Sequence, residues 1–341
     1  MQIKKLISFE VNNIDRWRDP YDTEEYSSRY LRAILKRIQN FAPELLYKLK
    51  VLKSHEWDEN YILLGIATLN LQMEEELDKI LKKLTIKKEW GLPIDWHSGK
   101  YKFPRGSLMS TTTSENILFL CDVYEKYPEK LNTKYLKDIG ENLLNTLNKV
   151  YLNEDEYLFS YTKFDKYKVI NSNLLVCAAL KKLFEITKNN VFYEEYNKVY
   201  NTILKRLPTK GYIPYFIDGG EETADSYHQL FCLRSFFILE ETNYKIYEEY
   251  FEKNFVVEKG VLFKAHLSYY DLQGLSEGIR YYGITNNESK FLELKNKLSY
   301  YYYRDRLIQR FLIKNKFIIK YKSLHSRQGF IRLLCALSYE K

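Results

Sequence analysis

The chain repeats a pattern of about fifty-five residues, and each repeat holds a helix that begins with polar residues and then becomes apolar. The clearest polar starts lie at residues 110–113, 171–173, 225–228, 271–273 and 327–328. A small residue follows each start by about two helical turns, and these small residues are Cys121, Cys177, Cys232, Gly278 and Cys335. A period of this size is typical of arrays of helical hairpins.

The two helices of each repeat differ in polarity. The first is apolar on nearly every side, as in residues 174–180, and the second carries Lys and Glu, as in residues 194–198. A helix that is apolar all round is buried, and one with a charged face lies outside. About six such hairpins predict an all-α closed toroid of the (α/α)6 type. An open solenoid is the alternative, but it needs polar end caps and the last helix ends apolar.

The repeats predict a single domain over residues 1–341, of which residues 1–60 are the least regular part. Short strand-like runs are expected in the loops near residues 157, 212, 261 and 317. Helices are expected at 26–50 with a break near Pro43, and at 61–71, 74–84, 114–127, 133–150, 173–187, 193–207, 225–241, 244–254, 271–282, 290–311 and 328–339. The connection at residues 88–106 is too long for a simple helix turn, and such loops are usually functional or disordered.

Composition sets broad limits on function. Hydrophobic residues make up 45% and charged residues 29% of 341 positions, which is enough for a large core. The net charge of +8 fits an acidic ligand, a nucleic acid or a membrane surface and selects none of them. The four cysteines form no C-x-x-C pair, so they are expected to be small buried residues in a reducing compartment. No signal peptide and no run of about eighteen apolar residues occurs, which predicts a cytoplasmic protein without a membrane span.

Several short motifs recur in a fixed order from about Tyr61 to the end. They read Trp90-Gly91-x-Pro93-x-Asp95-Trp96, Asn171-x-Asn173-Leu174-Leu175, Asp225-x-Tyr227-His228 and Arg327-x-Gly329-Phe330. In order and spacing they resemble the bacterial six-hairpin toroid proteins found with capsule, exopolysaccharide and O-antigen synthesis genes. The resemblance implies the toroid fold and a role in surface-polysaccharide synthesis. The usual Asn-Phe-His triplet of that group is replaced here by Ser226-Tyr227-His228.

The resemblance does not identify the reaction. The wider toroid class includes sugar epimerases, uronyl hydrolases, polysaccharide lyases, inverting glycosidases and terpenoid cyclases. Nucleotide-binding glycine loops, an H-E-x-x-H motif and the acidic motif of terpenoid cyclases are all missing from the sequence. We therefore expect no metal and no cofactor.

The first candidate site is Asp225 with His228. At a spacing of three on one helix turn, both side chains can face the same cavity. A carboxylate that orients an imidazole raises its basicity, as a general base requires. In the alternative interpretation, Asp225 only caps the helix and His228 is a satisfied residue of the inner wall.

A second candidate lies in the long loop. Asp95 would supply a second catalytic carboxyl, and Trp96, His97 and Tyr101 would grip a sugar by ring stacking and hydrogen bonds. The alternative is a structural plug in which Trp90 and Trp96 close one end of the toroid.

Further polar starts complete a ring of predicted substrate-binding residues, namely Asn171, Asn173, Asp271, Gln273 and Arg327. The Arg327 guanidinium could clamp a carboxylate or phosphate, or it could pair with Asp271 instead. Tyr215 ends a strand-like run and could reach the cavity, although packing is the simpler role for one of 32 tyrosines.

Two functions of different classes fit these observations. The first is an acid/base enzyme that epimerises, cleaves by elimination or hydrolyses a surface oligosaccharide or polysaccharide, including an acidic one. The second is a non-catalytic binding or scaffold protein of the same pathway. A third and weaker option, binding of single-stranded nucleic acid, rests only on residues 300–304, where four tyrosines precede an arginine, and no nucleic-acid partner is expected. The oligomeric state is not indicated.

Overall fold

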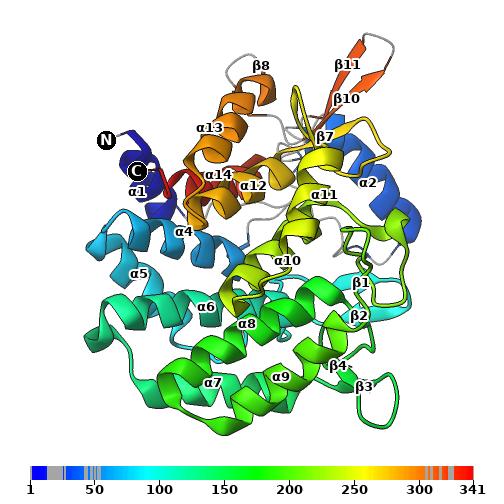
Figure 1. Ribbon diagram of the computed structural model, residues 1–341. Helices are drawn as coiled ribbons and strands as arrows, with labels where there is room; N and C mark the ends of the chain where they lie inside the picture. Colours follow the sequence, from blue (N-terminus) through cyan, green and yellow to red (C-terminus); the bar gives the residue numbers. More distant parts are fainter. Residues whose placement is uncertain are drawn as a thin grey trace. The chain divides into compact units, whose positions relative to one another are not determined.

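The structure is a computed structural model that describes residues 2–13, 26, 28–41, 45–46, 49, 51, 55–303, 306–307, 310–314, 317–321 and 326–340. The chain forms two compact units. The first unit comprises Met1–Leu81, Pro93–Ser98 and Lys253–Lys341, and the second comprises Lys82–Leu92 and Gly99–Glu252. Figure 1 draws the elements of both units, and the single domain stays a prediction.

The second unit consists mainly of antiparallel helix pairs. Its elements are β2 (Tyr101–Phe103), α6 (Ser110–Lys126), η3 (Pro128–Lys130), α7 (Thr133–Thr146), β3 (Lys149–Tyr151), β4 (Tyr157–Phe159), α8 (Ile170–Thr187), α9 (Asn190–Leu204), η4 (Glu221–Thr223), α10 (Ser226–Leu239) and most of α11 (Lys245–Phe255). Helix α8 packs against α6, α9 and α10, and the paired strands β3 and β4 lie beside its start (Figure 1).

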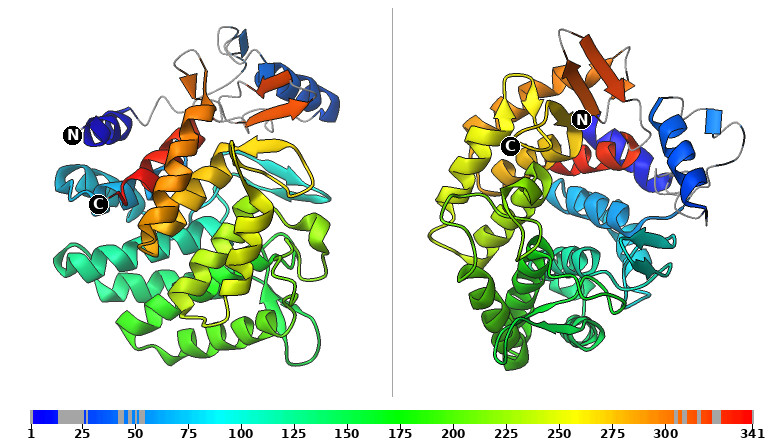
Figure 2. Two further views of the ribbon diagram at one scale, coloured as in Figure 1. Left: turned by 45° about the horizontal axis from the view of Figure 1, so that its top comes forward. Right: turned by 90° about the vertical axis from the view of Figure 1, so that its right-hand side faces the viewer.

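The first unit combines helices with short antiparallel strands (Figure 2). Its helices are α1 (Gln2–Asn12), α2 (Arg29–Phe41), α4 (Asp58–Asn70), most of α5 (Glu74–Leu84), α12 (Leu272–Ile284), α13 (Glu288–Asn296), η5 (Lys297–Tyr301) and α14 (Ser326–Leu337). Its strands are β1 (Trp96–Ser98), β5 (Val256–Val257), β6 (Gly260–Val261), β7 (Tyr269–Asp271), β8 (Tyr302–Tyr303), β9 (Arg306–Leu307), β10 (Arg310–Lys314) and β11 (Phe317–Tyr321). Strand β10 pairs with β7 and β11, and α14 packs against α12 and α4.

The predicted contrast between apolar and charged helices is confirmed by burial. In α8 every residue from Ile170 to Leu180 is buried, whereas α9 keeps an exposed polar face. The four cysteines Cys121, Cys177, Cys232 and Cys335 are all free and buried, as predicted. Burial raises the pKa of the Cys121, Cys177 and Cys232 thiols, so they stay protonated and unreactive near neutral pH.

Two predicted helices are too long. The helix predicted over residues 133–150 ends at Thr146, and strand β3 begins at Lys149. The helix expected over residues 290–311 ends at Asn296, and a 3₁₀ turn and strand β8 follow it. The tyrosines of this segment favour extended structure over helix. Tyr301 ends the 3₁₀ turn, is buried, and its hydroxyl accepts the Val261 backbone N–H at 3.3 Å. The predicted helix at 26–50 corresponds to α2 and to a helical stretch at residues 45–46, and the chain around Pro43 lies outside the described residues.

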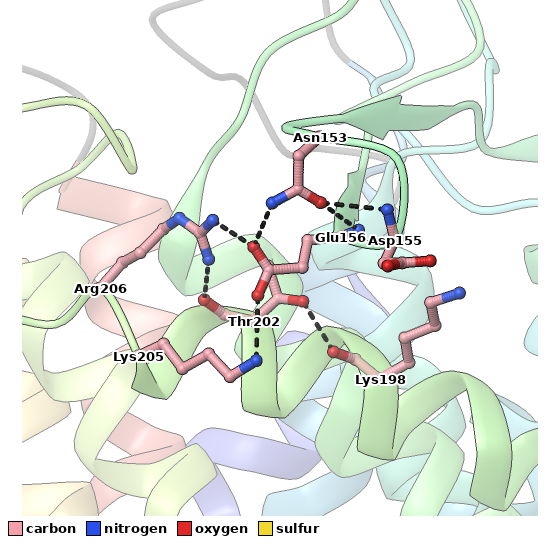
Figure 3. Close-up of polar contacts among 7 residues, drawn as sticks. All are labelled: Asn153, Asp155, Glu156, Lys198, Thr202, Lys205 and Arg206. Carbon is pink, nitrogen blue, oxygen red and sulfur yellow. Dashed lines mark hydrogen bonds and ion pairs between the residues drawn. The ribbon is translucent and has the colours of Figure 1, made fainter.

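A polar cluster ties the β3–β4 turn to the end of α9 (Figure 3). The Glu156 carboxylate accepts hydrogen bonds from Asn153 at 2.7 Å, from Lys205 at 3.0 Å and from Arg206. Arg206 also donates to the Thr202 carbonyl at 3.0 Å, which fixes its direction. These donors lower the pKa of Glu156 from 4.5 to about 2.

This lowered pKa predicts that the contribution of the Glu156 cluster to folding stability depends on pH. A depressed carboxyl pKa stabilises the fold above the unfolded-state value of 4.5, and the contribution is lost as pH falls toward about 2. We expect Glu156→Gln to be less stable than wild type above pH 4.5, with the difference shrinking at lower pH. Urea denaturation across this range measures it, and Glu154→Gln in the same turn is the control. A stability difference between wild type and Glu156→Gln that does not change with pH would contradict this prediction.

Candidate functional site

The start of α10 holds Asp225 and His228 in direct contact. Asp225 is the N-cap of the helix, and its Oδ1 accepts the His228 backbone N–H at 2.9 Å. Its Oδ2 lies 2.7 Å from Nδ1 of the His228 ring. One carboxylate thus caps the helix and orients the imidazole. The predicted cap and the contact with the imidazole are therefore both present, and the catalytic role stays a prediction.

The hydrogen bond fixes the state of the ring. An ionised carboxylate only accepts hydrogen bonds, so Nδ1 must carry the proton that it donates to Asp225. In the neutral imidazole, Nε2 then holds a free lone pair that can take up a proton. The Asp225 side chain is 6% exposed and the His228 side chain 27% exposed. A buried carboxylate behind a partly exposed imidazole is the arrangement that general acid/base chemistry needs.

Aromatic rings hold the imidazole from the side. The Tyr215 ring lies 4.6 Å from the His228 ring between centroids, and the Tyr227 ring lies 5.2 Å away. Tyr215 is itself anchored, since its carbonyl accepts the Ile170 N–H at 3.0 Å and its N–H donates to Thr223 Oγ1 at 3.2 Å. The structure therefore brings three predicted site residues together: Tyr215, Asp225 and His228.

The two asparagines at the start of α8 behave differently. Asn173 is fully buried, and its amide bonds Phe159 N–H at 2.7 Å, Phe159 carbonyl at 2.9 Å and Val169 carbonyl at 2.8 Å. This geometry favours a structural role that holds β4 to α8. Asn171 directly follows Ile170, whose backbone N–H donates to the Tyr215 carbonyl. The Oδ1 atom of Asn171 is buried and has no hydrogen-bond partner among the described residues.

The other predicted residues of the second unit separate into core and surface. Trp90 is buried, with its Nε1 donating to the Leu84 carbonyl at 3.2 Å, so this tryptophan is part of the core. Gly91 beside it approaches the Ser107 carbonyl so closely that a Cβ would lie 1.9 Å from the oxygen. Tyr101 is half-buried, and its ring contacts Tyr167 at 4.9 Å.

The remaining predicted residues lie in the first unit. Asp95, Trp96 and His97 are half-buried at the start of β1, and their roles stay predictions. Asp271 is fully buried and caps α12 by accepting the Gln273 N–H at 3.1 Å, while Gln273 is half-buried.

Arg327 lies in the first turn of α14, and its side chain falls outside the described residues. Its predicted clamp and its alternative pairing with Asp271 stay predictions. Asp95, the proposed second carboxyl, belongs to a different unit from His228, so the pair of opposed acid/base groups also stays a prediction.

The apolar helices also contain buried ion pairs that were not predicted from the sequence. In the second unit, Arg234 on α10 forms a bidentate ion pair with Glu115 on α6, in which Nη1 donates to Oε2 at 3.0 Å and Nη2 donates to Oε1. In the first unit, Arg332 on α14 bonds Glu277 on α12 and Glu59 on α4. The available signal was a charged residue among apolar neighbours, such as Arg234 in α10, because such charges are almost always paired when buried.

Comparisons with known proteins identify the fold and nothing finer. No family model matches the chain, and no curated protein matches it. Among solved structures, an α-amylase from Clostridium perfringens is 15% identical, with a TM-score of 0.60 over 85% of this chain and 87% of that one. The cellobiose 2-epimerase from Bacillus thermoamylovorans is 11% identical, with a TM-score of 0.53 over 81% and 86%. An α-1,6-mannanase variant from Salegentibacter in complex with α-1,6-mannotetrose is 11% identical, with a TM-score of 0.55 over 84% and 90%.

These neighbours share one architecture. The fold that this chain shares with them is an (α/α)6 toroid. The predicted fold class is thereby confirmed, and the structural neighbours named here process carbohydrates by different reactions. Among the helices that the structure describes, none combines the length and the apolar character needed to cross a bilayer.

Proposed function

We propose that this toroid is a carbohydrate-processing enzyme of bacterial surface-polysaccharide synthesis, with His228 as its proton-transfer group. The observation that carries the proposal is the 2.7 Å contact between Asp225 Oδ2 and His228 Nδ1, behind a partly exposed ring. The carbohydrate neighbours support the substrate class, and the resemblance of the motifs supports the pathway. The protein is proposed to act in the cytoplasm on an oligosaccharide or its precursor.

The chemistry open to the pair is proton transfer at a sugar. Nε2 of neutral His228 accepts a proton from a C–H or from a water, and the Asp225 carboxylate stabilises the imidazolium that results. The same imidazolium can return the proton to a leaving oxygen, whereas epimerisation needs a second acid on the opposite face of the sugar. Asp95 is proposed as the second carboxyl, and Trp96, His97, Tyr101, Asn171, Tyr215, Gln273 and Arg327 as substrate contacts. Epimerisation, elimination and hydrolysis all remain compatible with these groups.

Isotope labels separate the three reactions and test the proposal. The wild-type protein and His228→Gln are incubated with a panel of surface-polysaccharide fragments in D₂O and in H₂¹⁸O. Carbon-bound deuterium without cleavage indicates epimerisation, one ¹⁸O per new reducing end indicates hydrolysis, and an unsaturated sugar indicates elimination. We expect one of these products with wild type and at least a hundredfold less with His228→Gln. Equal product formation by both proteins would rule out His228 as the proton-transfer group.

A second candidate function is a non-catalytic carbohydrate-binding protein. The aromatic contacts around His228 favour it, since rings can hold a sugar without any proton transfer. It predicts that the same fragments bind wild type and His228→Gln equally, with no product from either.

A further inference from the structure

The rings that contact His228 continue along the second unit as an aromatic row. We define this row as Tyr101, Tyr167, Phe216 and Tyr215, which ends at His228. Successive ring centroids lie 4.9 Å apart for Tyr101 and Tyr167, 5.8 Å for Tyr167 and Phe216, and 4.6 Å for Phe216 and Tyr215. Four successive ring contacts therefore connect Tyr101 to His228.

The aromatic row is not part of the buried core. Phe216 is 36% exposed, and Tyr101, Tyr167 and Tyr215 are half-buried. Core rings of the same unit such as Phe159 and Phe192 are at most 1% exposed. A continuous run of accessible aromatic rings is costly to keep in water, and such patches mark binding sites.

A buried carboxylate holds the loop that carries Tyr167. Asp165 is 2% exposed, and its Oδ1 accepts the backbone N–H of Tyr161 at 3.1 Å and of Tyr167 at 2.8 Å. Its Oδ2 accepts the N–H and the hydroxyl of Thr162 at 2.7 and 2.8 Å. Asn148 fixes the same loop from outside by donating to the Lys163 carbonyl at 2.9 Å. Four bonds to one buried carboxylate make the position of Tyr167 rigid before any ligand arrives.

Close backbone contacts also hold the segments that carry Tyr167 and Phe216. Gly99 has φ = +56°, and a Cβ there would lie 2.6 Å from the Tyr167 hydroxyl. Only glycine allows this approach without strain. Phe216 forms an antiparallel bridge with Val169, and Ile217 N–H bonds the Lys168 carbonyl at 3.0 Å. The two segments that carry Tyr167 and Phe216 are therefore held together as one surface.

We propose that Tyr101, Tyr167 and Phe216 form sugar-binding subsites beyond the one at His228, so that the ligand is an extended oligosaccharide chain. This inference rests on the proposed function. Each aromatic ring can stack against the apolar face of one sugar while the hydroxyls stay hydrated or bonded. A preorganised row of rings selects chains over monosaccharides because every added sugar gains a contact at little ordering cost.

Binding to a size series tests the proposal. The probes are an array of fragments of one to six sugars prepared from bacterial capsular and O-antigen polysaccharides. We expect wild-type affinity to rise with length for the fragments that bind. Tyr167→Ala and Tyr101→Ala should lower the affinity for long fragments roughly two- to tenfold each and leave the shortest ones unchanged. Tyr167→Phe keeps the ring and should keep the affinity, and Tyr151→Ala, which is 59% exposed on β3 outside the row, is the matched control.

The outcomes separate this inference from the proposed function. Affinity that does not depend on length, or equal losses for short and long fragments, would overturn the subsites and leave the His228 chemistry standing. Length-dependent binding by wild type without any product would support the subsites and favour the binding protein. An array on which wild type binds no fragment would overturn both.

Discussion

Replacing Asp225 by Asn is expected to lower turnover about 10²- to 10⁴-fold while leaving stability nearly unchanged. The amide oxygen of Asn can still accept the His228 backbone N–H, and Asn caps helices about as well as Asp. The amide nitrogen, however, is a donor and cannot accept from Nδ1–H. The ring loses the partner that fixes its tautomer and that stabilises its protonated form.

Comparison with other variants isolates this effect from folding. Asp225→Ala loses both the helix cap and the acceptor for His228 Nδ1–H, and it should cost about 1 kcal/mol of stability as well. Asn132→Ala removes a cap at α7, where Asn132 accepts the Lys134 N–H at 2.7 Å, and should cost stability without affecting turnover. Urea denaturation and steady-state kinetics on the four proteins measure the two effects separately.

The kinetics also show whether Asp225 acts through His228. A positioning residue should lower kcat with little change in KM, and combining Asp225→Asn with His228→Gln should cost no more than His228→Gln alone. Additive losses would mean that Asp225 acts independently of the imidazole. An Asp225→Asn protein with wild-type turnover would leave Asp225 as a helix cap and nothing more.

The contact between Asp225 and His228 was predictable because it is local. A spacing of three on a helix, a cap residue and an imidazole are all visible in four consecutive letters. The contrast between buried apolar helices and helices with a charged face was equally predictable, since burial of α8 follows from its apolar composition.

The aromatic row was not predictable in this way. Tyr101 and Tyr167 are 66 positions apart, and their contact depends on Gly99 and on the loop that Asp165 organises. With 32 tyrosines in the chain, composition alone does not single out the two that meet. The contact between Tyr301 and Val261 is equally invisible in the sequence pattern, because the two residues are 40 positions apart.

Breaking the buried pair between Arg234 and Glu115 is expected to destabilise the protein by about 3–5 kcal/mol. The two side chains are 2% and 10% exposed and join α10 to α6 through two bonds. Arg234→Met leaves a carboxylate in an environment that cannot solvate it, and Glu115→Gln leaves the guanidinium without its counter-charge. Urea denaturation of each single variant measures the loss.

A double variant tests whether the cost comes from the pair or from the stranded charge. Replacing both residues by apolar ones, Glu115→Leu with Arg234→Met, removes the desolvation cost together with the attraction and should recover most of the lost stability. The matched control is Lys182→Met, which removes the exposed pair with Glu125 between α8 and α6 and should cost at most about 1 kcal/mol. If the double variant were as unstable as the sum of the singles, Glu115 and Arg234 would contribute independently, and the stranded charge would not explain the cost. If the singles cost no more than the control, solvent must reach Glu115 and Arg234, and the interior between α6 and α10 would be open to water.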